Sequence, residues 1–105
     1  MPVYAVIGLD RRPTNDQARE THRAAHRAYV TGHLDPLQCA GAMLDGDGSQ
    51  CGSLYIFEAD SADQVRQWLA AEPFVANGIY ETLAVREIQV GPLWTVPRGP
   101  IALGS

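Results

Sequence analysis

The chain has 105 residues with 12 acidic and eight basic side chains, which give a formal net charge of −4 at neutral pH. This length corresponds to one domain, and the negative charge argues against nucleic acid or an anionic membrane surface as a partner. No apolar stretch approaches the roughly 20 residues needed to cross a bilayer, and the first strand is too short and too polar at its flanks for a signal peptide, so we expect a cytoplasmic protein.

The first half of the chain predicts a strand, a helix and a second strand. Residues 3–9 are apolar throughout, as in a central strand. Residues 14–17 form a capping box, Thr-x-x-Gln. The helix that it opens spans about 15–30, with Gly32 as its stop signal. Residues 37–44 predict the second strand.

The second half of the chain predicts the same order of elements, a strand, a helix and a strand. After a glycine-rich turn, residues 52–59 predict a third strand, which forms a hairpin with the second. Residues 61–64 are a second capping box and open a helix that must end before Pro73. Residues 80–90 predict the last strand, with a bulge near 86–87 because the apolar alternation changes phase there.

The predicted order of elements, βαββαβ, is that of an α+β ferredoxin-like fold. Right-handed crossovers place both helices on one face of the antiparallel sheet. The other face then exposes apolar side chains, and the sheet of a second copy would cover it, so we expect a homodimer. We assign residues 1–96 to this domain and 97–105 to a C-terminal tail.

Neither the cysteines nor the histidines make a convincing metal motif. Cys39 and Cys51 lack redox or zinc spacing. In the predicted hairpin, Cys39 lies opposite a residue near Ile56, so we expect no disulfide between the two cysteines. His22 and His26 are four residues apart and could share a metal ion, but the pattern His-Glu-x-x-His is absent. We therefore predict neither a metal nor another cofactor.

His26 is the candidate catalytic residue. It lies near the apolar edge of the first helix, and histidine is the side chain whose unperturbed pKa lies near neutral pH. A structural histidine is the alternative interpretation. One turn before it, Arg23 could hold a substrate carboxylate or phenolate, or pair with Glu20 or Glu72.

Several short motifs follow one another in a recognisable order. They are Gly8-Leu9-Asp10, Arg23-x-x-His26-x-x-Tyr29, Gly41, Gly52-Ser53 and Glu72-Pro73-Phe74-x-x-x-Gly78. Over residues 3–95 the chain resembles the YCII-related (YciI-like) proteins. This resemblance implies a dimeric ferredoxin-like fold of the dimeric α/β barrel group, with an acid–base site centred on histidine and aspartate. It also implies similarity to small-molecule lyases, such as a dehydrochlorinase acting on a chlorinated hydroxyquinol.

The chain departs from the family pattern at two positions. Glu72 stands where the family usually has aspartate, and Ala42 follows Gly41 where the family usually has proline. Because glutamate is one methylene longer than aspartate, we expect a pair between His26 and Glu72 to have an altered geometry.

Two carboxylates that match the family pattern, Asp10 and Glu72, could pair with His26. The first helix rises about 1.5 Å per residue, so His26 lies on the order of 16 Å from the end where Asp10 is expected. Glu72 follows the second helix, whose C-terminal end falls at the same edge of the sheet as the C-terminal half of the first. Topology therefore favours Glu72, while Asp10 remains the alternative.

We therefore expect a small, cofactor-independent lyase or isomerase acting on a small polar or aromatic metabolite. A carboxylate that accepts a hydrogen bond from one imidazole nitrogen leaves the other free to act as a base. The candidate catalytic residues are His26, Glu72 and Asp10, and the candidate substrate contacts are Arg23, Ser53 and Tyr55. The competing hypothesis is a non-catalytic ligand-binding or dimerisation module of the same fold.

Overall fold

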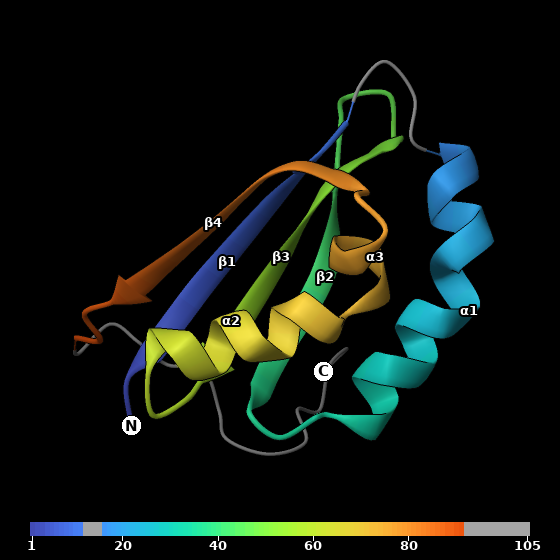
Figure 1. The fold of residues 1–105 in the computed structure, drawn as a ribbon. Coiled ribbons are helices and arrows are strands. Elements are labelled where there is room, and N and C mark those ends of the chain that lie inside the picture. The colour runs from blue at the N-terminus through green and yellow to red at the C-terminus, as the bar shows by residue number, and fades with distance from the viewer. Residues whose placement is uncertain (12–15, 92–105) are drawn as a thin grey trace, which may run out of the picture.

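The structure, a computed structural model, describes residues 1–11 and 16–91 and has the predicted α+β ferredoxin-like fold (Figure 1). The elements in chain order are β1 (Val3–Asp10), α1 (Asp16–Gly32), β2 (Leu37–Leu44), β3 (Gln50–Glu58), α2 (Ala62–Ala71), α3 (Pro73–Ala76) and β4 (Tyr80–Ile88). None of the helices in these residues is long and apolar enough to cross a membrane.

The four strands form one antiparallel sheet in the order β2-β3-β1-β4. The predicted hairpin of β2 and β3 is confirmed, with Cys39 opposite Ile56. The predicted bulge near residues 86–87 is wrong, because β4 pairs with β1 without interruption from Thr82 to Ile88. The register shift lies instead at the start of β4, where Leu9 pairs with Thr82 but Asp10 pairs with Tyr80.

The bulge prediction failed because both faces of β4 carry apolar side chains. Leu83 and Val85 pair with the β1 residues Gly8 and Val6 and pack against the core. Ile88 pairs with Val3, one position out of phase, and therefore lies on the opposite face of a regular strand. Apolar residues on alternate faces thus look like a change of phase in the sequence.

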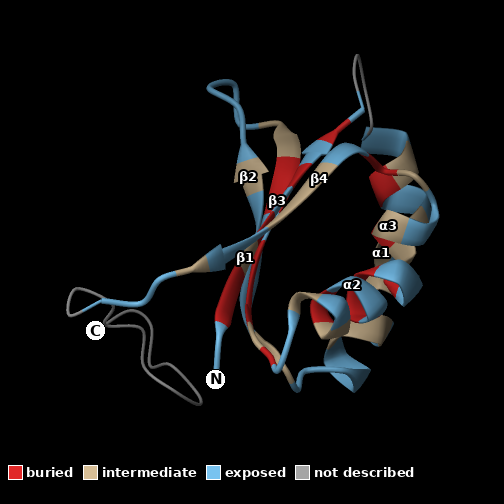
Figure 2. Ribbon diagram, turned by 60° about the vertical axis from the view of Figure 1, so that its left-hand side comes forward, coloured by how far each residue is buried: buried red, intermediate tan, exposed pale blue. Residues whose placement is uncertain are grey.

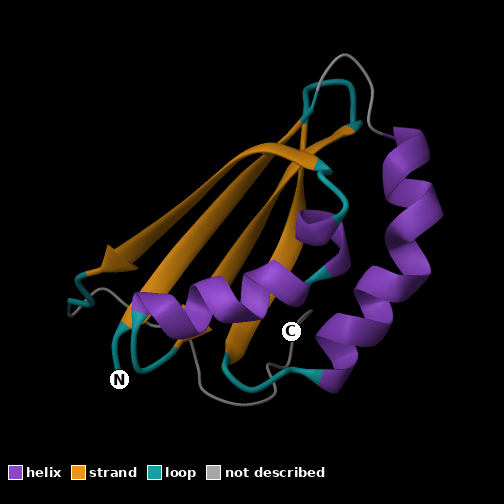
Figure 3. Cartoon of the chain, in the orientation of Figure 1, coloured by secondary structure: helices purple, strands orange, loops and turns teal. Residues whose placement is uncertain are grey.

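The three helices lie on one face of the sheet, as Figures 2 and 3 show. The core between these layers is built mainly from aromatic and branched side chains: Tyr4, Val6, Tyr55, Phe57, Ala59, Val65, Trp68, Leu69, Phe74, Ile79 and Tyr80. The other face of the sheet is apolar, and none of the described helices covers it (Figure 2). Ile7, Leu9 and Leu54 are 43 %, 49 % and 38 % exposed there.

Helix α2 is capped at its N-terminus by Ser61, as the sequence predicts. The Ser61 hydroxyl accepts a hydrogen bond from the Gln64 backbone N–H, at 3.2 Å. The Gln64 side chain accepts from the Asp60 N–H instead of reaching back to Ser61. The first predicted capping box includes residues 14 and 15, which lie outside the described part of the chain, as does the predicted tail 97–105.

Candidate active site

His26 and Glu72 form a direct contact between helix α1 and the junction of α2 and α3. The Nδ1 atom of His26 is hydrogen-bonded to Oε1 of Glu72. The Glu72 carboxylate is fully buried, whereas the His26 side chain is 22 % exposed. The imidazole stacks on the Phe74 ring, with the two centroids 4.0 Å apart and the planes 5° from parallel. A contact on one nitrogen and a flat wall beneath the ring therefore fix the orientation of His26.

The local sequence explains why Glu72 is held so firmly. Its backbone is extended, so α2 ends there, and Pro73 occupies the first position of α3, where no N–H is needed. The second carboxylate oxygen, Oε2, accepts a hydrogen bond from the Val75 N–H at 3.2 Å and caps α3. One oxygen is thus used by the helix cap, while the other reaches His26.

Asp10, the other predicted partner of His26, lies in a different pair. It accepts two hydrogen bonds from Arg19, from Nε at 2.6 Å and from Nη2 at 2.8 Å. Both residues are buried, with exposures of 4 % and 2 %. The topological argument that separated Asp10 from His26 agrees with this arrangement.

Arg19 is a site residue that the sequence analysis missed. A buried arginine requires a carboxylate partner. Once Glu72 is chosen as the partner of His26, Asp10 is the candidate carboxylate that still lacks a partner. The spacing also carried a signal, because Arg19, Arg23 and Arg27 recur every four residues along α1 and therefore share one side of the helix.

Arg19 continues into a chain of buried hydroxyl groups. Its Nη2 atom donates to the Gly52 carbonyl at 3.0 Å and to the Ser53 hydroxyl at 3.1 Å. Ser53 also accepts from the Tyr80 hydroxyl at 2.8 Å, and the oxygens of Tyr80 and Tyr55 lie 2.7 Å apart. Two predicted substrate contacts, Ser53 and Tyr55, are thereby connected through Tyr80, which the sequence analysis did not identify.

Burial determines the protonation of this network. Desolvation opposes the charged form of Arg19, but the hydrogen bond and charge of Asp10 outweigh it, so the pKa of Arg19 is raised. Desolvation also raises the pKa of Tyr55 and that of Tyr80. The arginine therefore stays charged and both phenols stay neutral at physiological pH.

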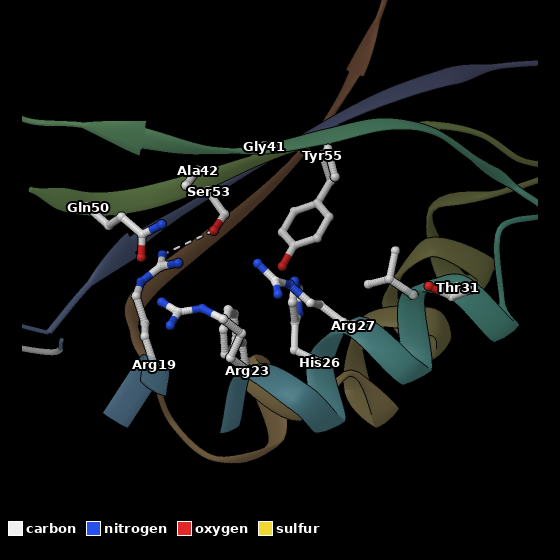
Figure 4. A pocket seen from close by; sticks show the side chains of 13 residues that line it. Arg19, Arg23, His26, Arg27, Thr31, Gly41, Ala42, Gln50, Ser53 and Tyr55 are labelled. Carbon is white, nitrogen blue, oxygen red and sulfur yellow. Dashed lines mark hydrogen bonds between the residues drawn. The ribbon is translucent and has the colours of Figure 1, made fainter. Parts of the chain in front are cut away.

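A cavity of about 340 Å³ lies between α1 and the strands β2 and β3 (Figure 4). Such a volume is at the lower end of the range for small-molecule sites. His26 and all three predicted substrate contacts line it: Arg23, Ser53 and Tyr55. Arg23 pairs with Glu20 and not with Glu72. Asp10 and Glu72 do not line the cavity but support residues that do.

The described residues contain no group of three or more histidine, cysteine, aspartate or glutamate side chains that could hold a metal ion.

Comparison with known proteins places this geometry in a family. The model of the YCII-related domain matches residues 3–89. The chain belongs to the YCII-related family. A similar solved structure is that of 5-chloro-2-hydroxyhydroquinone dehydrochlorinase from Burkholderia phenoliruptrix, in complex with 2,5-dihydroxybenzoquinone. The two proteins are 30 % identical, with a TM-score of 0.75 over 85 % of this chain and 95 % of the dehydrochlorinase.

More distant structures share the fold alone. Rv0793 from Mycobacterium tuberculosis is 16 % identical, with a TM-score of 0.52 over 90 % of this YCII-related chain and 100 % of its own. A protein described as an antibiotic biosynthesis monooxygenase is 14 % identical, with a TM-score of 0.54 over 88 % of this chain and 100 % of the monooxygenase. The dimeric α/β barrel grouping of this fold rests on the family match and on the dehydrochlorinase structure. The comparison with curated proteins gave no match.

Proposed function

We propose that this YCII-related protein is a small acid–base enzyme, a lyase or isomerase, in which His26 is the base and Glu72 orients it. The contact between His26 Nδ1 and the buried Glu72 carboxylate carries this proposal. A carboxylate in this position holds a proton on Nδ1 and leaves the lone pair of Nε2 available. Among the described residues none hydrogen-bonds to Nε2, and His26 lines the cavity.

The chemistry that follows is proton transfer at one position of the substrate. Nε2 removes a proton. In a lyase, the electron pair left behind forms a double bond as a leaving group departs with its own pair. In an isomerase no group departs: that pair forms a double bond at a new position, and the displaced electron pair takes up a proton at another atom of the substrate. Glu72 stabilises the imidazolium that results, because its charge is close and buried. In a lyase, His26 then returns the proton to solvent, whereas in an isomerase it delivers the proton to another atom of the same substrate.

The substrate that we propose is a small hydroxylated ring, chlorinated in the case of a lyase. The cavity volume suits one ring with its substituents, and the stacked Phe74 and His26 rings provide a flat surface at one side. The 30 % identical dehydrochlorinase is named for 5-chloro-2-hydroxyhydroquinone. That compound is therefore the first substrate to test.

The test is release of chloride from 5-chloro-2-hydroxyhydroquinone by the wild-type protein and by His26→Asn. We expect His26→Asn to lower the rate by roughly 10²–10⁴-fold, the usual contribution of a general base. His22→Asn, one turn earlier on α1, is the matched control and should keep the wild-type rate. Equal rates for His26→Asn and wild type would overturn the role of His26, and an unreactive wild type would overturn this substrate.

We further propose that two copies associate through the uncovered face of the sheet. This face carries Ile7, Leu9 and Leu54, and exposed apolar patches of this kind mark association surfaces. Light scattering after gel filtration should give the mass of a dimer for the wild type and of a monomer for Ile7→Glu. Leu34→Glu, at an exposed position outside the sheet, is the control. A monomeric wild type at micromolar concentration would refute the dimer.

A further inference from the structure

Positive charge is concentrated around the cavity of an otherwise acidic protein. All eight basic residues of the chain are arginines, against 12 acidic residues. Three of the arginines, Arg19, Arg23 and Arg27, line this cavity together with His26, and none of the described residues that line it is acidic. Figure 4 shows these side chains rising from α1 toward the strands. A concave surface lined by one sign of charge attracts ligands of the opposite sign.

The three arginines differ in how far their charge is compensated. Asp10 holds Arg19 through two hydrogen bonds, and Glu20 holds Arg23. Within the described residues Arg27 forms no ion pair. The charge of Arg27 is therefore available to a ligand in the cavity.

Counting donors and acceptors shows what Ser53 offers to that ligand. Its oxygen already accepts from the Tyr80 hydroxyl at 2.8 Å and from Arg19 Nη2 at 3.1 Å, where it shares the two hydrogens of that nitrogen with Asp10 and the Gly52 carbonyl. A hydroxyl group has two acceptor positions and one hydrogen, so both acceptor positions are filled. Ser53 lines the cavity. With its acceptor positions used, it can still donate its own hydrogen to a ligand there. The charged donor Arg19 polarises this O–H group and strengthens it as a donor.

The same count gives Tyr55 the opposite role. Tyr80 has one hydrogen, which it donates to Ser53. The hydrogen bond of 2.7 Å between the two phenols must then be donated by Tyr55. With its hydrogen used, Tyr55 presents only acceptor positions to the cavity that it lines.

We infer that the cavity binds the ionised oxygen of a small planar ligand, a phenolate, enolate or carboxylate, through the Ser53 hydroxyl and the charge of Arg27. A hydroxyl of the same ligand donates to Tyr55. Tyr80 is a positioning residue, because it fills the second acceptor position of Ser53 and takes the hydrogen of Tyr55. This assignment rests on the proposed function, for which it defines the substrate class.

The experiment compares ligands that differ in charge. 2,5-Dihydroxybenzoquinone has two vinylogous carboxylic acid groups and is an anion at neutral pH. 2,5-Dimethoxybenzoquinone has the same ring without an ionisable group, and benzoate provides a carboxylate. Equilibrium dialysis should show the enolate, the carboxylate or both binding at least about tenfold more tightly than the dimethoxy compound. The binding of the anion should weaken as salt is raised.

Variants then locate the anion. Arg27→Gln should weaken binding of the anion about threefold, as for an exposed ion pair, whereas Arg66→Gln, an exposed arginine of α2, should not. Ser53→Ala should weaken it about tenfold. Tyr80→Phe should reduce the ratio of anion to dimethoxy affinity, which a purely structural role would leave unchanged.

Two results would overturn the inference: equal affinity for the charged and neutral quinones, or equal effects of Arg27→Gln and Arg66→Gln. Because Arg27 is exposed, its variant should fold even if Ser53→Ala does not. The affinity comparison separates this inference from the proposed function, because binding of the two quinones to the wild type and to Arg27→Gln is measured without any turnover. Anion binding without turnover of 5-chloro-2-hydroxyhydroquinone would overturn that substrate and support the anion site.

Discussion

Glu72→Gln tests the arrangement of His26 most directly, because it changes the hydrogen-bonding pattern with almost no change of shape. The carboxylate uses two acceptor oxygens, one for His26 Nδ1 and one for the Val75 N–H. Glutamine has one acceptor oxygen and one donor NH₂ group. It can therefore serve only one of these partners as the glutamate does.

The two orientations of the amide have different costs. If the oxygen stays on Val75, the NH₂ group faces Nδ1, which must then lose its proton to Nε2, and the base is lost. If the amide is reversed, its NH₂ group meets the Val75 N–H, and a buried donor is left unsatisfied at a cost of about 1–3 kcal/mol. We expect the first orientation and a decrease in turnover of roughly 10²–10⁴-fold, equivalent to about 2.7–5.4 kcal/mol at 1.36 kcal/mol per factor of ten.

Nitrogen-detected NMR of the neutral imidazole distinguishes the two tautomers. The wild type should carry the His26 proton on Nδ1 and Glu72→Gln on Nε2, while chloride release from 5-chloro-2-hydroxyhydroquinone follows the activity. Glu87→Gln, at an exposed position of β4, controls for the loss of one negative charge. If the wild type carries the proton on Nε2, or if Glu72→Gln is fully active, the role assigned to Glu72 is refuted.

Three further predictions concern the buried network. Asp10→Asn leaves the Arg19 charge uncompensated and should lower the free energy of unfolding by about 3 kcal/mol in urea titrations; an unchanged midpoint would contradict this. A Cβ atom at Gly8 would lie 2.8–3.0 Å from the Tyr80 ring, so Gly8→Ala should cost about 1–3 kcal/mol by the same assay. Burial raises the pKa of both Tyr55 and Tyr80 above the ordinary value of 10.0, so the unfolded chain releases these protons first. The free energy of unfolding should therefore fall as the pH rises above about 10, which alkaline denaturation would test.

The fold was predictable because each element carries its own signal in the sequence. The apolar run 3–9, the capping box at Ser61 and the proline at position 73 each fix one element or boundary. The phase of the last strand was not predictable from its own residues, because the alternation expected for a half-buried strand fails when both faces are apolar.

The pairing of His26 with Glu72 was accessible to sequence reasoning because helix rise and chain direction fix which ends of elements meet. The burial of Arg19 was not accessible to sequence reasoning, since nothing in the residues next to Arg19 distinguishes it from Arg23 or Arg27. Only the three-dimensional position of Asp10 decides which of the three arginines is enclosed.

The two carboxylates considered as partners of His26 are both buried, yet the residues that they bind give them different roles in proton transfer. Asp10 is bound to a guanidinium, which keeps its proton at any physiological pH, so this pair carries fixed charges. Glu72 is bound to an imidazole, a ring that can accept a proton on one nitrogen while it donates from the other. We therefore propose that proton transfer at this cavity runs through His26 and Glu72, while Asp10 holds the arginine that donates to Ser53. The division follows from the chemistry of the partners and does not depend on the identity of the substrate.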